Sequence, residues 1–455
     1  TAAVAKIFGT GLSFLSLKLG TGLAGLFTLP YIYLLGKEIG NRRIGLIAMF
    51  LAGVAYWPNV ISRVALRFTL YPFFAAPLLY YLIRGLRRRR RNDFLLAGIA
   101  LGLGLHGYSP SRIVPLVVLV AFLLYVLHQR TTQERKQALV ALSLVVLISL
   151  IVFLPLLRFV LENYQIFMYR GLTRVSDLER PLPGSPMKIF FQNLGRALIM
   201  FQWDNGEAWV HSIPGRPALG VVSAAFFTLG AFLLFVRYLR ERDWLDLFLL
   251  LSIPLLMLPS ILSLAFPNEN PSLNRTGAAL IPVFLVVAVA MDGLVESLKS
   301  GFESRWGRRF AWGVVIVLLT ISASQNYRLV FHKYYEMFDS GSWNTSDLGA
   351  VIRQFDETIG DEDQAWVVPY PHWVDTRLVG VHAGYPTRDF ALWREYLSST
   401  EEEKGPKLFL FKPNDVETEE VLRKLYRNGS LDVYRAKYPG QNFMIYFVPP
   451  QETEQ

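Results

Sequence analysis

The segment Ala138–Leu157, with the sequence ALVALSLVVLISLIVFLPLL, contains no charged residue. A helix rises about 1.5 Å per residue, so a segment of this length crosses a hydrocarbon layer of about 30 Å. A helix in the core of a water-soluble protein would normally show a polar face over such a length. Leu245–Phe266 repeats the pattern with a single acidic residue. The sequence therefore predicts a membrane protein.

Apolar segments of this kind recur through the first two thirds of the 455 residues, of which 52% are hydrophobic. They predict a mostly α-helical, polytopic membrane bundle of about ten helices. The expected helices lie at about 19–36, 44–61, 68–84, 94–107, 113–128, 138–157, 217–237, 244–266, 276–295 and 310–327.

The net charge of +10 comes from short basic runs between the apolar segments. These runs are Lys37–Arg43, Arg84–Arg91, Gln129–Lys136, Arg237–Arg242 and Lys299–Arg309. Basic residues gather in the cytoplasmic loops of membrane proteins, so orientation in a membrane explains this pattern better than binding to nucleic acid. The alternation predicts a multi-pass protein of the plasma membrane, in which the remaining loops and the C-terminal residues are extracytoplasmic.

The predicted membrane domain covers residues 1–327 and includes a long extracytoplasmic loop at 158–216. This loop is too long to be a simple connection. Its stretch Met187–Phe201 has apolar residues near helical spacing and predicts an amphipathic helix. Two interpretations remain open: a helix that lies in the membrane interface, or a surface helix packed on the domain below it.

Residues 328–455 are expected to form a soluble extracytoplasmic α/β domain with a mixed sheet. The predicted helices are Asp347–Thr358 and Thr418–Arg427. The predicted strands are Gln364–Pro369 and Lys407–Lys412, followed by a hairpin of Leu431–Ala436 and Phe443–Val448.

Motifs of soluble enzymes are absent from the sequence, which has no phosphate-binding Gly-Lys-Ser/Thr loop and no Gly-x-Ser-x-Gly elbow. There is no cysteine, and the six histidines do not show zinc spacing. A divalent metal is conceivable, but no pattern supports one. Gly102, Gly104 and Gly107 lie within an apolar segment, where small residues favour close helix packing rather than phosphate binding.

Polar side chains gather at the predicted outer ends of the helices, where ionisable groups usually mark a functional site. They are Arg63 and Arg67, which are four residues apart, then His106, Tyr108 and Arg112, and finally Glu269 and Arg275. Several arginines at one interface suit a lipid phosphate, which they bind through charge-assisted hydrogen bonds. The alternative for each arginine is an ordinary contact with membrane lipids or a loop carboxylate.

The loop at residues 201–217 adds acid–base and aromatic groups on the same side. Asp204, Glu207, His211 and Arg216 are candidates for orienting an acceptor, or they cap and solvate turns. Trp203 and Trp209 suit stacking on a sugar ring, although tryptophan is also common at membrane interfaces.

The order of these motifs resembles the GT-C superfamily of membrane glycosyltransferases, especially the branch of protein O-mannosyltransferases and the lipid A aminoarabinose transferase. The resemblance rests on 33–43 (YLLGKEIGNRR), 62–67 (SRVALR), 106–112 (HGYSPSR), 214–217 (PGRP) and Asn274-Arg275 with Ala278–Pro282. It implies the transfer of a sugar, with inversion, from a polyprenyl-phosphate donor to a glycan, lipid or protein acceptor at the extracytoplasmic face.

On this pattern Arg63, Arg112 and Arg275 would face the lipid phosphate, and His106 and Tyr108 would line its pocket. The superfamily's catalytic carboxylate lies in a first external loop, which is expected upstream of Thr1. The catalytic residue therefore stays unassigned, and we expect the first helix and its loop to precede this sequence.

A second hypothesis is a non-catalytic subunit that keeps the GT-C fold as a scaffold or lipid-binding partner in a membrane complex. Such a subunit would transfer no sugar and would co-purify with other subunits. A transporter is disfavoured, because transporters usually place ionisable residues in the middle of their spans, and these spans are apolar there.

Overall fold

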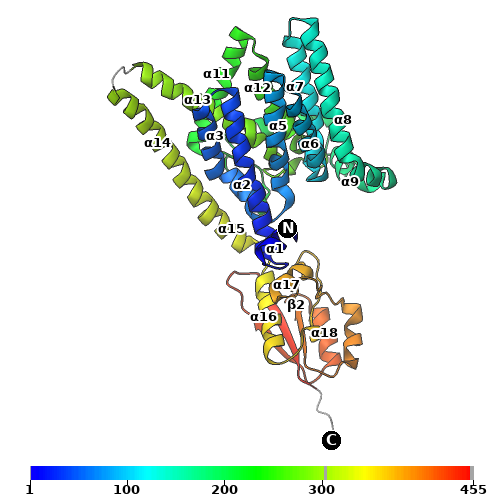
Figure 1. Cartoon of the computed structure of the whole chain (residues 1–455). Coiled ribbons are helices and arrows are strands. Elements are labelled where there is room, and N and C mark those ends of the chain that lie inside the picture. Colours follow the sequence, from blue (N-terminus) through cyan, green and yellow to red (C-terminus); the bar gives the residue numbers. More distant parts are fainter. Residues whose placement is uncertain (1, 302–304, 451–455) are drawn as a thin grey trace. The chain divides into compact units, whose positions relative to one another are not determined.

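The computed structural model describes residues 2–301 and 305–450, which form two compact units (Figure 1). One unit, here the membrane unit, comprises Lys18–Met337. The other, here the C-terminal unit, combines Thr1–Leu17 with Phe338–Gln455. The division falls ten residues later than the boundary expected at 327/328, because the last long helix continues through the π-helical turn Leu329–Lys333 into α15 (Tyr334–Gly341).

All ten predicted membrane segments are helical, which confirms the predicted helical bundle. The helices are α2 (Phe14–Ile39), α3 (Arg42–Val54) with α4 (Tyr56–Arg63), α5 (Leu70–Arg88), α6 (Arg91–His106), α7 (Val114–His128), α8 (Thr132–Glu162), α11 (Val221–Glu241), α12 (Trp244–Ile261), α13 (Leu280–Gly301) and α14 (Arg305–Arg328).

Among the described residues, seven helices are long and apolar enough to cross a membrane, and the bent pair α3–α4 makes an eighth. The bend between α3 and α4 is 50°. The two remaining helices of the predicted ten are α5 and α6, and α6 has only 16 residues. In the apolar stretch of α13, 83% of the residues are buried, against 17% in α8. Helix α13 is therefore enclosed by its neighbours, whereas most of the apolar stretch of α8 is exposed. Helix α8 lies at one edge of the bundle (Figure 1).

Two helical hairpins of the membrane unit are each closed by an ion pair between an arginine and an aspartate. Arg84 near the end of α5 binds Asp93 at the start of α6 through two hydrogen bonds, one of them Nε to Oδ2 at 2.9 Å. Arg237 of α11 binds Asp246 of α12 in the same way, with Nε to Oδ2 at 2.6 Å. Both aspartates are buried, and removing the partner of a buried charge is strongly destabilising, so each pair helps to hold its hairpin together.

The glycines of α6 allow that helix to approach α8 closely, as the sequence predicts for Gly102. A Cβ on Gly98 would lie 2.8 Å from Cβ of Ile148, and one on Gly102 would lie 2.6 Å from Cβ of Val152. Gly104 faces Phe74 of α5 instead. These positions serve packing between helices.

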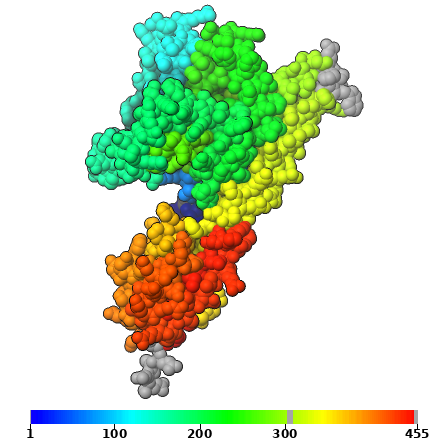
Figure 2. Space-filling model, turned by 180° about the vertical axis from the view of Figure 1, so that it is seen from behind, coloured from blue at the N-terminus to red at the C-terminus, as the bar shows by residue number. Residues whose placement is uncertain are grey.

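The long loop at 158–216 contains two helices, α9 (Tyr164–Val175) and α10 (Pro186–Ile199). The amphipathic helix is confirmed by α10, whereas α9 was not predicted. Asn193 of α10 is buried, and its Nδ2 donates to the carbonyl of Ile261 at 2.9 Å. One face of α10 therefore packs on the bundle, while Met187 and Phe191 are exposed on another. In both views α9 protrudes sideways from the bundle (Figures 1 and 2).

The C-terminal unit contains a four-stranded mixed sheet with the order β1-β2-β4-β3. Its strands are β1 (Ala365–Val367), β2 (Lys407–Phe411), β3 (Ser430–Tyr434) and β4 (Phe443–Val448), and only the β1–β2 pair is parallel. The helices are α16 (Thr345–Thr358), α17 (Thr376–Ala383) and α18 (Val416–Leu425). The predicted helices, strands and hairpin are all present, and α17 was not predicted.

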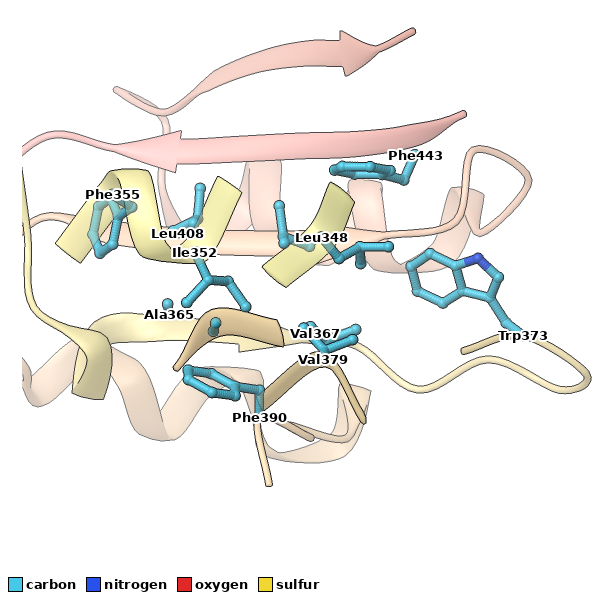
Figure 3. Close-up of a cluster of buried hydrophobic side chains, with 12 residues drawn as sticks. Leu348, Ile352, Phe355, Ala365, Val367, Trp373, Val379, Phe390, Leu408 and Phe443 are labelled. Carbon is cyan, nitrogen blue, oxygen red and sulfur yellow. The ribbon is translucent and has the colours of Figure 1, made fainter. Parts of the chain in front are cut away.

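Buried side chains between α16 and the sheet hold this unit together (Figure 3). Leu348 and Ile352 of α16 pack with Val367 of β1 and Leu408 of β2. Trp373 joins the same core from the loop before α17. The C-terminal unit therefore has an apolar core of its own.

Candidate functional site

The chain turns sharply between α4 and the short helix η1 (Arg67–Thr69), and this turn separates two predicted site residues. Helix α4 ends at Arg63, and Ala65 has a positive φ of 57°. The spacing of four residues predicts that Arg63 and Arg67 share one helical face. They do not, because the helix ends at Arg63. The positive φ, uncommon for alanine, redirects the chain so that Arg67 enters a different environment.

Arg67 lies over the ring of Tyr108, with its guanidinium carbon 5.9 Å from the ring centre. Tyr108 is buried, and its hydroxyl accepts a hydrogen bond from Nδ2 of Asn274 at 3.2 Å. This contact joins the turn before α7 to the loop before α13. Within the described parts of the chain, the arginine has no hydrogen-bonding or carboxylate partner.

Glu269 binds two arginines from different segments. Nη1 of Arg174, on α9, lies 2.9 Å from one carboxylate oxygen, and Arg275 binds the other. Arg275 also donates from Nη1 to Oγ of Ser263 at 2.9 Å. Burial raises the pKa of Glu269, but Arg275 and Arg174 outweigh this effect, so its pKa lies below the ordinary value. The carboxylate is therefore ionised near neutral pH.

The positive charges of four arginines act on the ionisation of Tyr108. Burial raises the pKa of the Tyr108 phenol to about 12, while Arg275, Arg67, Arg170 and Arg174 act in the opposite direction. We call these four residues the arginine cluster. With Glu269 as the acidic residue bound among them, the cluster keeps a strong positive charge. Such a concentration of guanidinium groups is suited to an anion.

Arg112 lies at the edge of the cluster and holds α9 in place. Its guanidinium carbon is 3.6 Å from the ring centre of Phe167, and Nη1 donates to the carbonyl of Phe167 at 2.8 Å. Its Nε is buried without a hydrogen-bond partner among the described residues. The positive charge of Arg67 also acts electrostatically on Arg112.

Two predicted residues lie in other surroundings. Nε2 of His106 is 3.0 Å from the carbonyl of Val152 on α8, and its ring contacts Phe153. Arg63 lies over Phe331 at 4.5 Å. It also joins Lys18 in lining a cavity of about 450 Å³ between α2 and the α3–α4 bend.

His211 is the one predicted acceptor-side residue that adjoins the cluster. Its Nε2 is 3.2 Å from Oγ of Ser272, and its ring lies 5.5 Å from that of Phe68. The pKa of His211 is lowered to about 4, because burial and the charge of Arg275 outweigh the opposite effect of Glu269. The imidazole is therefore neutral near pH 7.

Asp204 and Glu207 line a separate cleft of about 380 Å³. Trp203, which is 75% exposed, lies at this cleft with Arg196 and Asn268. Asn268 directly precedes Glu269, so the chain links the cleft to the arginine cluster. An exposed indole beside carboxylates and amides is a typical surface for a sugar ring.

Arg216 does not reach this cleft. Its guanidinium lies over the ring of Tyr56, 4.3 Å from the ring centre. The hydroxyl of Tyr56 in turn accepts from the backbone nitrogen of Ile213 at 2.5 Å. Arg216 thus fixes the Pro-Gly-Arg-Pro turn on α4.

Carboxylates close enough to share a metal ion occur at one place in the described chain, at Asp361, Glu362 and Asp363 of the C-terminal unit. Asp363 already binds Arg388 there. Within the described part of the membrane unit no comparable group of carboxylates and histidines occurs.

Sequence reasoning missed Arg170 and Arg174, which α9 contributes to the cluster. Their spacing of four residues is a detectable signal, because it places both on one face of a helix. The long loop obscured this signal, since no helix was expected before residue 187.

Residues 1–159 match the family model described as dolichyl-phosphate-mannose-protein mannosyltransferase. No curated protein matches the chain. The match includes α2 to α8 up to Phe159 and hence Arg67, Tyr108 and Arg112 of the site.

Solved structures extend the likeness over almost the whole chain. The Archaeoglobus fulgidus oligosaccharyltransferase, tethered with an acceptor peptide, has a TM-score of 0.54 and 15% identity over 95% of this chain. ArnT from Cupriavidus metallidurans, bound to undecaprenyl phosphate, has a TM-score of 0.57 and 13% identity over 99%. The chain has the GT-C fold of these membrane glycosyltransferases.

The chain spans 59% of the length of the tethered Archaeoglobus structure and 87% of ArnT. A third similar structure is the Archaeoglobus enzyme AglB with an inhibitory peptide and a dolichol-phosphate, at a TM-score of 0.53 and 15% identity over 95% of this chain and 60% of that one. At such identities the likeness establishes the fold.

Proposed function

We propose that the protein is a membrane glycosyltransferase that moves a hexosyl or pentosyl group, with inversion, from a polyprenyl-phosphate sugar to an acceptor. The observation that carries this proposal is the grouping of Arg67, which lies over Tyr108, with Arg174 and Arg275, which both bind Glu269; Asn274, next to Arg275, donates to the Tyr108 hydroxyl. Two structures of the same fold contain a polyprenyl-type phosphate, which supports a lipid-phosphate ligand.

The arginine cluster is suited to the leaving group of this reaction. When the sugar departs, negative charge increases on the phosphate, and fixed guanidinium groups stabilise that charge. Arg67 can donate to a phosphate without breaking an ion pair, because it holds no carboxylate in the described chain. Arg275 and Arg174 are held in position by Glu269. Arg112 adds positive charge at the edge.

The cleft of Trp203, Asp204 and Glu207 is suited to the acceptor. The exposed indole offers a surface for a ring, and the carboxylates accept hydrogen bonds from hydroxyl groups. A glycan, a glycolipid and a protein side chain all present such hydroxyls. His211, which is neutral and lies beside Arg275, connects this acceptor side to the cluster.

The proposal places the cluster and the C-terminal unit at the extracytoplasmic face of the plasma membrane. Support comes from the basic hairpins at the other end of the helices, such as the α5–α6 turn with Arg87, Arg88 and Arg89. Basic loops of membrane proteins stay in the cytoplasm.

Sugar transfer is tested with membranes that contain the protein and with labelled polyprenyl-phosphate sugars as donors. Wild-type protein should release polyprenyl phosphate and form a labelled glycoconjugate, while Arg67→Gln should lose most of this activity. If the protein binds polyprenyl phosphate but transfers sugar from no donor, the proposed transferase activity is contradicted. That result would favour the second hypothesis, a non-catalytic lipid-binding subunit.

A further inference from the structure

A second basic site lies at the opposite end of the membrane unit from the arginine cluster. Helix α5 begins three residues after Arg67 and runs for 19 residues, about 28 Å, to Arg88. Beyond its end, a groove of about 810 Å³ lies between the α5–α6 turn and the start of α8. The sugar-transfer site proposed above does not use this groove.

The polar end of the groove carries three cations and one carboxylate. Arg89, Arg91, Lys136 and Glu134 line it, and Arg89 forms an ion pair with Glu134. Arg91 and Lys136 are exposed and have no polar partner in the described chain. The groove therefore has two uncompensated positive charges.

Helix geometry adds to this positive potential. Arg91 is the first residue of α6, and α8 starts at Thr132, four residues before Lys136. The free backbone N–H groups of a helix N-terminus favour an anion. Gln133 and Gln137 provide further donors in the lining.

The rest of the groove is apolar and open toward the membrane. Phe94 and Leu86 form its buried floor, and Val140, Leu144 and Leu147 of α8 form its wall. Val140 and Leu147 are exposed in a helix that is apolar enough to span a bilayer. A cationic end joined to an apolar channel at this depth matches a phospholipid, because a soluble anion would leave the apolar wall uncovered.

We propose that this groove binds an anionic phospholipid of the inner leaflet. The phosphate lies between Arg91 and Lys136, and an acyl chain runs along α8 past Leu144. Charge complementarity selects the lipid: an anionic headgroup such as phosphatidylglycerol gains from two unpaired cations, whereas zwitterionic phosphatidylcholine carries a cation of its own. The site would anchor the α5–α6 and α7–α8 hairpins to one lipid.

The test compares lipid retention by native mass spectrometry of the purified protein, supplied with phosphatidylglycerol or phosphatidylcholine. The variant Arg91→Gln/Lys136→Gln should retain roughly tenfold less phosphatidylglycerol than wild type and an unchanged amount of phosphatidylcholine. The control, Arg42→Gln/Arg240→Gln, removes two exposed arginines of other basic turns that do not line the groove.

An equal loss in both double variants would overturn the proposal, because it would show general attraction to the basic end. Unchanged retention in the groove variant would overturn it as well. Inorganic phosphate should not protect the protein against heat, whereas phosphatidylglycerol should. Arg275 belongs to the arginine cluster and does not line the groove, so Arg275→Gln should leave phosphatidylglycerol retention intact. The lipid groove and the sugar-transfer site are therefore tested by different variants, and either proposal can fail without the other.

Discussion

At the scale of single residues, the ion pairs around Glu269 divide the arginines into two groups. Arg174 and Arg275 are bound to this carboxylate, whereas Arg67 lies over the ring of Tyr108 and has no carboxylate partner among the described residues. A bound arginine is a rigid donor, and an unpaired one is available to a ligand. This division gives the two kinds of residue different expected effects on substitution.

Arg275→Gln should weaken binding of polyprenyl phosphate roughly tenfold to hundredfold, because a hydrogen bond to a charged group contributes about 1.5–3 kcal/mol. Binding is measured by displacement of a fluorescent polyprenyl phosphate from detergent-solubilised protein. The matched control is Arg158→Gln, which removes an exposed arginine paired only with Glu162. Equal affinities of wild type and Arg275→Gln would exclude Arg275 from the phosphate site.

His211 should make the protein less stable as the pH falls from 7 to 5. Its pKa is about 4 in the folded protein, below the ordinary histidine value. The unfolded chain therefore binds more protons in this window, and stability falls with pH. His211→Gln keeps a partner for Ser272 and should reduce the drop in melting temperature. If both proteins lose stability in parallel, His211 does not carry this dependence.

Residue types and motif order predicted Arg112, Tyr108 and Arg275 near one another, but they did not predict in which direction each side chain points. His106 is the last residue of α6 and contacts α8, whereas Tyr108, two residues later, is buried. Ala65 has a positive φ, which separates Arg63 from Arg67. A positive φ is uncommon for alanine, so this turn could not be predicted from the residue type. Directions at helix ends depend on such local turns.

At the scale of elements, close packing of α6 on α8 depends on two glycines. A Cβ at Gly102 would lie 2.6 Å from Cβ of Val152, so Gly102→Ala should force the helices apart. We expect a loss of about 1–3 kcal/mol, seen as a lower melting temperature in detergent. Gly195→Ala in α10 is the control, because no atom lies within 4 Å of the new Cβ. A melting temperature for Gly102→Ala at or above the wild-type value would contradict this account.

The α11–α12 hairpin should depend on the ion pair between half-exposed Arg237 and buried Asp246. Asp246→Asn removes the carboxylate that Arg237 binds and should cost about 1.5–3 kcal/mol, the contribution of hydrogen bonds to a charged group. Thermal unfolding of the variant measures this loss. Glu162→Gln, which breaks the exposed pair with Arg158, should cost less than about 1 kcal/mol. Similar costs for the two variants would show that the hairpin does not rely on Asp246.

Apolar length predicted the membrane helices well, because bilayer thickness fixes how long such a segment must be. Helices outside that constraint were harder to find. Helix α9 mixes Phe167 and Arg170 within one turn and shows no long apolar stripe. In the C-terminal unit, α17 has eight residues, too few for a clear periodic signal.

At the scale of the whole molecule, the topology predicts opposite accessibility for two exposed serines. Ser398 lies in the C-terminal unit and Ser300 at the end of α13, beside a basic run. Because the chain has no cysteine, Ser398→Cys and Ser300→Cys introduce single labels. A membrane-impermeant maleimide should label Ser398→Cys in intact cells and Ser300→Cys only after permeabilisation. The reverse pattern would invert the orientation.

The central claim is that the arginine cluster around Tyr108 binds the phosphate of a polyprenyl lipid. The most direct measurement is an experimental structure of the protein with polyprenyl phosphate. The account predicts phosphate density within hydrogen-bonding distance of Arg67 and Arg275. Density for the phosphate elsewhere, with both arginines unchanged and free of ligand, would contradict it.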